Sequence, residues 1–258
     1  MKNDYGFVVT HIPHSSILIP EEYKVGFLLN EKSLQKEIRR MTDAFCDELY
    51  DAPEMNNKVV ADISRLVCDV ERFRDDKQEP RAKFGQGLMY TRTSYMKRLR
   101  NNDRGLREKI LYEIYDPHHA KLNGTVKKAL ENYGKCLIID GHSFNARKIV
   151  KPDNIFSLPD FDIGTDSFHT PDGLRDKLCE KVRDIGYKPK INTPYAGAIT
   201  PMEYYRKDRR VISVMIETNR KLYMNERSMT KTEGFELTRE ICHELMRTAA
   251  EYVRIMEF

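Results

Sequence analysis

The hydrophobic positions of the chain fall into two kinds of segment, short continuous runs and longer periodic stretches. Continuous apolar runs occur at residues 7–10, 136–139 and 211–216. Runs this short, rich in β-branched side chains and apolar on both faces, are typical of strands buried in a parallel or mixed sheet. We therefore expect three core strands.

Between these runs, apolar residues recur at steps of three and four. This spacing predicts helices over residues 31–50, 104–132 and 173–185, and a last helix through Leu237, Ile241, Leu245, Ala249 and Tyr252. Strands that alternate with helices are typical of an α/β fold, here with a mixed, mostly parallel central sheet and helices on both faces.

The chain contains no repeat, low-complexity tract or Pro/Gly/Ser-rich linker. Residues 1–258 are therefore expected to form a single domain. The segment 151–171 is rich in proline and aspartate, and we expect it to be an ordered loop at the active site.

Composition narrows the class of protein. Hydrophobic residues make up 40% and charged residues 33% of the chain, as in globular proteins. No run approaches the roughly 18 apolar residues of a membrane helix, and residues 1–5 lack the apolar core of a signal peptide. We therefore expect a cytoplasmic protein with no membrane partner. Five cysteines without a CxxC pair indicate reduced packing residues.

The charge balance points away from nucleic acid. The net charge is only +4, from 44 basic and 40 acidic residues. The basic run at residues 92–109 is interpreted as a solvated helix face, and no RNA- or DNA-binding signature accompanies it. Small anionic partners remain compatible with this charge, so we expect a small-molecule ligand.

Two histidines and a glutamate follow the three apolar runs. His14 comes after the first run, His142 after the second, and Glu217 directly after the third. Gly141 stands where we expect the second run to turn tightly. Ligands of open α/β sheets bind beyond the carboxyl ends of the strands, so these side chains are expected to meet in one crevice.

This set of side chains fits a catalytic zinc site, because such sites combine imidazole and carboxylate groups with an open position for water. The metal lowers the pKa of that water to about 7, and Glu217 could take its proton. The alternative for each histidine is a hydrogen-bonded side chain at a strand end.

Two arginines, Arg65 and Arg72, flank the stretch 66–71. Arginine binds carboxylates through two parallel hydrogen bonds, so both could orient an acidic substrate. The alternative is that Asp69 or Glu71 pairs with an arginine inside a loop.

Seven motifs follow one another along the chain. They are His-Ile-Pro-His-Ser-Ser (11–16), Thr-Asp (42–43), Ser-Arg (64–65) followed by Asp69 and Arg72, Asp-Gly-His-Ser (140–143), Leu-Pro-Asp-Phe-Asp-Ile-Gly-Thr (158–165), Asn-Thr-Pro-Tyr-Ala-Gly-Ala-Ile-Thr (192–200) and Glu-Thr-Asn-Arg (217–220). Through them most of the chain resembles the N-formylglutamate amidohydrolase family, which is related more distantly to aspartoacylases and zinc carboxypeptidases.

The resemblance implies a phosphorylase/hydrolase-like, zinc exopeptidase-like α/β fold that holds one zinc ion per chain. It implies hydrolysis of the amide of an N-acyl, formyl-type amino acid or a related small amide. His14 and His142 are implied as metal ligands and Glu217 as the general base. Asp43 is the third ligand suggested by the motif, although a regular helix over 31–50 would turn it away from the apolar stripe. His11 is the reserve ligand.

The resemblance also implies residues that contact the substrate. Arg65 would stabilise the oxyanion and Arg72 would bind a substrate carboxylate. Tyr195 and Thr200 could line the substrate pocket, where Gly197 would allow close approach of the backbone. His119 is a candidate for contact with the site residues.

Glu71 departs from the family pattern, which usually has an asparagine at this position. A carboxylate beside the arginines would weaken their positive field and favour a neutral or cationic N-acyl compound, a short peptide or a lactam over formylglutamate. It also motivates an alternative function, a non-catalytic small-ligand-binding or regulatory protein that keeps the hydrolase fold. The sequence leaves the oligomeric state and the metal loaded in cells open.

Overall fold

The computed structural model describes residues 4–145 and 158–257. Its main strands are β1 (Val8–Ile12), β2 (Asn57–Val60), β3 (Cys136–Phe144), β4 (Phe161–Gly164), β5 (Pro189–Ile191) and β6 (Val211–Asn219), followed by the short pair β7 (Met224–Asn225) and β8 (Thr230–Lys231). The helices are α1 (Glu21–Lys24), α2 (Glu31–Met41), α3 (Cys46–Leu49), α4 (Arg104–Ile110), α5 (Asp116–Tyr133), α6 (Asp172–Asp184) and α7 (Phe235–Arg254).

The chain divides into two compact units. The sheet unit comprises Met1–Ile12, Phe45–Lys58 and Asn123–Phe258, and the second unit comprises Pro13–Ala44 and Val59–Leu122. The single domain expected from the sequence stays a prediction.

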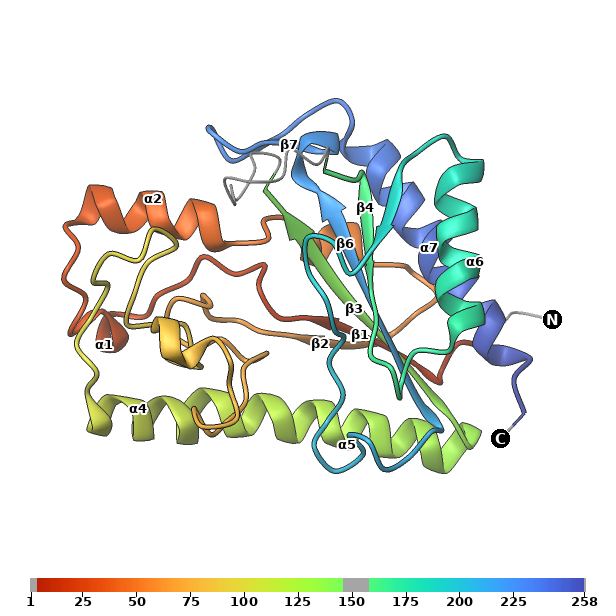
Figure 1. The fold of residues 1–258 in the computed structure, drawn as a ribbon, viewed down its shortest axis with the longest axis horizontal. Coiled ribbons are helices and arrows are strands. Elements are labelled where there is room, and N and C mark those ends of the chain that lie inside the picture. Colours follow the sequence, from red (N-terminus) through yellow and green to blue (C-terminus); the bar gives the residue numbers. More distant parts are fainter. Residues whose placement is uncertain (1–3, 146–157, 258) are drawn as a thin grey trace. The chain divides into compact units, whose positions relative to one another are not determined.

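The central sheet is mixed and mostly parallel, as predicted. Its strand order is β2-β1-β3-β6-β4-β5, and β1, β3 and β6 run parallel to one another (Figure 1). β4 is antiparallel to β6 and parallel to β5. Every residue of β3 and β6 is buried, which explains why these strands appear in the sequence as continuous apolar runs.

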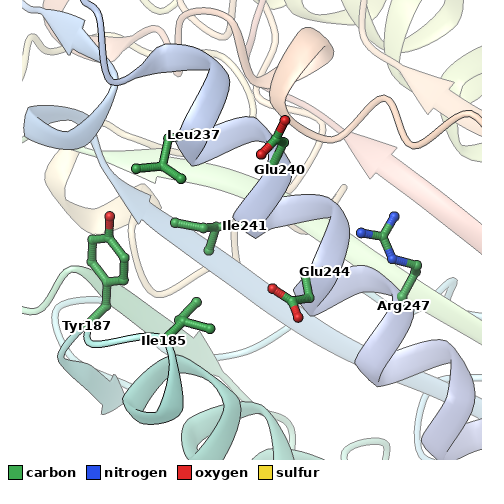
Figure 2. A pocket seen from close by; sticks show the side chains of 7 residues that line it. All are labelled: Ile185, Tyr187, Leu237, Glu240, Ile241, Glu244 and Arg247. Atoms are coloured by element: carbon green, nitrogen blue, oxygen red, sulfur yellow. The ribbon is translucent and has the colours of Figure 1, made fainter.

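Helices α6 and α7 pack against each other beside the sheet, where α6 contacts β4 and α7 contacts β3 (Figure 1). The apolar stripe of α7 is buried at Ile241, Leu245 and Ala249. Leu237 and Tyr252 of the predicted stripe are not buried, and 55% of Leu237 is exposed. Its side chain lies with Ile241 and Tyr187 in a surface pocket, as Figure 2 shows. None of the predicted site residues lines this pocket.

The second unit has a hydrophobic core of its own. Leu34 and Ile38 come from α2 and Ile110 from α4, while Leu66 and Leu88 come from the connecting segments.

In the part of the chain that the structure describes, no helix has the length and apolarity needed to cross a membrane.

The helix predicted over residues 31–50 is interrupted. α2 ends at Met41, Thr42 is extended (φ −82°, ψ 133°), and Phe45 has a left-handed backbone (φ 66°) before α3 begins. The amide N–H of Asp43 donates to the carbonyl oxygen of His14 (2.9 Å) and so leaves the helical ladder. Asp43 is buried, so the outward position expected for it in a regular helix was wrong.

The tight turn expected at Gly141 was also wrong, because β3 continues through this residue to Phe144. A Cβ atom on Gly141 would lie 2.7 Å from the ring of Tyr50. The hydroxyl of Tyr50 donates to the carbonyl oxygen of Ile216 (2.7 Å). Glycine is therefore needed here for the close approach of an aromatic ring, not for a turn.

Other predicted elements differ less from those in the structure. The helix predicted over 104–132 is formed by α4 and α5, joined by a π-helical turn at Leu111–Tyr115. The basic run does not form one solvated helix face, since helix begins only at Arg104 and Arg100 is buried. Of the loop expected at 151–171, residues 151–157 lie outside the described residues. The remainder includes β4, whose Phe161 and Ile163 are buried in the sheet. All five cysteines are buried and free of disulfide bonds.

Candidate active site

Ionisable side chains gather on one face of the sheet, near the ends of β1, β3 and β6. Residues paired across neighbouring strands project to the same face, and alternate residues of one strand share a face. Asp140 and His142 therefore lie on the same face of β3. His11 pairs with Asp140. Glu217 pairs with His142 on one side and with Asp162 on the other. All of these residues are buried.

Asp140 links two imidazoles of this face. Its Oδ1 lies 2.7 Å from His11 Nδ1 and 3.2 Å from His142 Nε2. Burial acts to raise the pKa of Asp140, but the interactions with His142 and His11 outweigh it and hold the pKa well below its usual range. Asp140 is therefore an ionised carboxylate that lies beside the Nε2 edge of His142. Carboxylates orient metal-binding histidines in this way, which makes Nδ1 the candidate ligand atom of His142.

His14, in the second unit, has the same arrangement. Its Nε2 lies 2.8 Å from Asp69 Oδ1, while its Nδ1 lies 3.7 Å from Asp43 Oδ2 and 3.5 Å from Glu71 Oε2. Tetrahedral zinc with bonds of 2.0–2.1 Å places its ligand atoms about 3.3 Å apart. The spacing around His14 Nδ1 therefore suits a metal ion. His14, Asp69 and Glu71 each offer one possible ligand atom within 4.8 Å of the others.

Asp69 also holds both candidate arginines. Arg65 Nη2 lies 2.8 Å and Arg72 Nη2 3.4 Å from Asp69 Oδ2, and the Tyr90 hydroxyl donates to the same oxygen (2.5 Å). Burial acts to raise the pKa of Asp69, but Arg65, Arg72 and His14 lower it well below its usual range. The pairing of Asp69 with an arginine, one of the two interpretations of these residues, is therefore present in the structure.

The backbone around Glu71 is held by the π-helical turn and the beginning of α5. The ring of His119 donates through Nε2 to the carbonyl oxygen of Val70 (2.8 Å), and the Tyr115 hydroxyl donates to that of Arg72 (2.7 Å). His119 therefore holds the backbone next to Glu71.

The remaining predicted residues lie in the sheet unit, in the segment after β5. Tyr195 is 39% exposed, and Gly197 has a positive φ of 102°. Thr200 is buried, with its Oγ1 3.1 Å from Ser213 Oγ. His142 and Glu217 are brought together by the sheet, as predicted, whereas His14 and Asp43 belong to the second unit.

Asp140 and Asp162 were not among the predicted site residues. A signal for Asp140 was present, since it stands two residues before His142 and must share its face of a strand. Asp162 alternates with Phe161 and Ile163 in a segment interpreted as loop, so its place in the sheet was missed. His11, the reserve ligand, contacts Asp140 through Nδ1.

The structure thus defines an α/β protein with histidine–carboxylate clusters suited to a metal ion. The family model of N-formylglutamate amidohydrolase matches residues 7–224, and the chain belongs to this family. The family resemblance seen in the sequence is confirmed.

Individual relatives agree with this assignment. An N-formylglutamate deformylase of Pseudomonas putida is 26% identical over 237 residues, which cover 83% of this chain and 80% of the relative. The crystal structure of an N-formylglutamate amidohydrolase from Ralstonia eutropha JMP134 has a TM-score of 0.82 and 24% identity, covering 96% of this chain and 94% of that chain. A gene product of Agrobacterium tumefaciens has a TM-score of 0.69 and 20% identity, covering 96% and 92%. The two structures confirm the mostly parallel α/β fold.

Proposed function

We propose that the protein is a metal-dependent amidohydrolase that cleaves the amide bond of an N-acyl amino acid of the formyl type. Family membership and the P. putida deformylase support the reaction class. The observation that carries the proposal is the repeated carboxylate–histidine pair. His14 and His142 each have Nε2 beside a buried aspartate, the arrangement that prepares imidazoles for a metal.

One zinc ion is proposed to be held by His14, Asp43 and His142. The donor set fits, because Asp43 Oδ2 faces His14 Nδ1 and because imidazole and carboxylate are ordinary zinc ligands. When bound, zinc polarises a carbonyl group and lowers the pKa of its water to about 7.

The chain's own residues supply the proton transfers and the orientation. Glu217 takes a proton from the attacking water and delivers it to the leaving nitrogen, so that the carbon–nitrogen bond breaks to give a carboxylic acid and an amine. Arg65 stabilises the developing oxyanion and Arg72 holds the substrate carboxylate, both oriented by Asp69. Tyr195, Gly197 and Thr200 line the substrate site.

Glu71 bears on the choice of substrate. Arg65 and Arg72 carry two positive charges, and Asp69 and Glu71 carry two negative ones, so the group has no net charge of its own to attract a second carboxylate on the substrate. We therefore expect N-formyl amino acids with neutral or basic side chains to be turned over faster than N-formylglutamate.

The test is a screen of formyl, acetyl and succinyl amino acids with protein purified without chelator, run with and without added zinc. Zinc-dependent release of the free amino acid from a formyl compound supports the proposal. A protein that binds zinc and these compounds but hydrolyses none of them would instead be the non-catalytic ligand-binding protein considered above.

A further inference from the structure

The segment 193–199 of the sheet unit is fastened at both ends by buried carboxylates. Near its start, Asp162 in β4 accepts the amide N–H of Thr193 through Oδ1 (2.8 Å) and that of Tyr195 through Oδ2 (3.0 Å). At its end, Asp140 in β3 accepts the amide N–H of Ile199 (3.1 Å). Since β6 lies between β3 and β4, the two ends are held on either side of the strand that carries Glu217.

The middle of the segment lies directly on the sheet. A Cβ atom added to Gly164 in β4 would lie 2.5 Å from the carbonyl oxygen of Gly197 and 2.2 Å from Met215 Cε. The left-handed backbone at Gly197 (φ 102°) belongs to the same close approach. Three points of contact therefore define where this segment runs.

Asp162 is placed to join this segment to the reacting groups. It is fully buried, both of its oxygens accept backbone N–H groups, and it pairs directly with Glu217 across the two strands. A buried carboxylate is stabilised by such hydrogen bonds, and leaving its partners unsatisfied is costly. A change at Asp162 should therefore be transmitted to Tyr195, a residue that is 39% exposed.

We propose that Asp162 is a positioning residue for substrate binding, which holds the segment 193–199 so that Tyr195 and Gly197 contact the substrate beside Glu217. This inference rests on the proposed function. Because Asp162 acts through the backbone of the segment and takes no part in proton transfer, its loss affects KM more than kcat.

The variant for the test is Asp162→Asn, which replaces one accepting oxygen by an NH2 group that faces a backbone N–H. The control is Asp160→Asn, because Asp160 also accepts a backbone N–H, that of Lys188 (3.0 Å), and forms an ion pair with Lys221 (2.7 Å). Hydrogen–deuterium exchange of the amides of Thr193 and Tyr195, measured without substrate, reports the anchoring directly.

We expect Asp162→Asn to speed exchange about tenfold at the one of these two amides that loses its acceptor oxygen, and to raise KM about tenfold, with kcat changed less than about threefold, since one lost hydrogen bond corresponds to about one factor of ten. Asp160→Asn should match the wild type in both measurements. Unchanged exchange in Asp162→Asn, or faster exchange with an unchanged KM, would overturn the inference.

The two proposals fail in different ways. If the wild type hydrolyses no N-acyl amino acid, the proposed function fails, and with it the substrate role of Asp162, while the exchange data still decide the anchoring. If Asp162→Asn does not fold, Gly164→Ala serves as the second variant, because its methyl group displaces the segment at Gly197. An unchanged KM in a folded Gly164→Ala variant would also overturn the inference.

Discussion

At the scale of single residues, the site is governed by which edge of each imidazole a carboxylate occupies. Asp140 and Asp69 lie beside the Nε2 edges of His142 and His14, and each carboxylate is kept ionised by the charges around it. The aspartates therefore leave the Nδ1 edge of each imidazole as the candidate for a metal ligand, as carboxylates beside metal-binding histidines do.

The first prediction concerns these two aspartates. Asp140→Asn and Asp69→Asn should each weaken zinc binding by about 10–100-fold, because an amide orients the histidine less strongly than a carboxylate does. Competition with a chromophoric chelator measures the affinity, and Asp160→Asn is the control. If both site variants bound zinc with the affinity of the wild type, the aspartates would have no part in metal binding.

A second prediction tests Glu217. Glu217→Gln should keep its zinc and its fold, while kcat falls by about 10²–10⁴-fold, the usual contribution of a positioned general base. Glu240→Gln, at an exposed position in α7, should retain full activity. Undiminished turnover in Glu217→Gln would remove this residue from the mechanism.

A third prediction follows from the pKa of Asp162, which burial raises from 3.8 to about 6 despite the amides of Thr193 and Tyr195 and the charge of Lys190. Between about pH 4 and pH 6, the folded protein therefore keeps a proton on Asp162 that the unfolded chain has released. The contribution of this group to the free energy of unfolding is fully present below about pH 4 and is lost as the pH rises through about 6. Relative to Asp162→Asn, the wild type should lose about 3 kcal/mol of unfolding free energy over that range. Urea titrations at several pH values measure it, and a pH-independent difference would contradict the assignment.

At the scale of secondary-structure elements, the sequence predicted the central strands and most helices but not their limits. β3 and β6 extend to Phe144 and Asn219 because polar residues can stay in a strand when the sheet pairs them, as it pairs His142 with Glu217. The break after α2 could not be predicted, since the apolar period continues through it. It depends on a hydrogen bond from Asp43 to the distant His14, which no local pattern records.

Gly141 allows the close packing of Tyr50 on β3 to be tested. Gly141→Ala should destabilise the protein by about 1–3 kcal/mol, because its methyl group would overlap the tyrosine ring. Gly124→Ala is the matched control, since a Cβ there, within α5, meets no atom within 4 Å. The control should be more stable than the wild type by about 1 kcal/mol through helix propensity. Equal stabilities of the two variants in urea unfolding would contradict the packing argument.

At the scale of the whole molecule, the motifs identified the family and the reaction class, because residue types at strand ends are a local property of the sequence. The proposed ligand set is less local, since its residues His14, Asp43 and His142 come from separate stretches of the sequence. The second unit by itself already offers a candidate cluster in His14, Asp69 and Glu71. Two ligand sets are therefore proposed, one that includes His142 and one that does not.

Zinc-dependent thermal stability distinguishes these two ligand sets. Zinc at 100 times its Kd should stabilise the fold by about 2.7 kcal/mol, a rise in Tm of about 5–10 °C for a chain of this size. If the ion is held by the proposed set of His14, Asp43 and His142, His14→Ala and His142→Ala each abolish the shift, because either variant removes a ligand. If the ion is held within the second unit, His142→Ala keeps the shift and Glu71→Gln loses it. His243→Ala, in α7, should respond to zinc as the wild type does. We expect both histidine variants to lose the shift, because the proposed role of Glu71 is to select against acidic substrates.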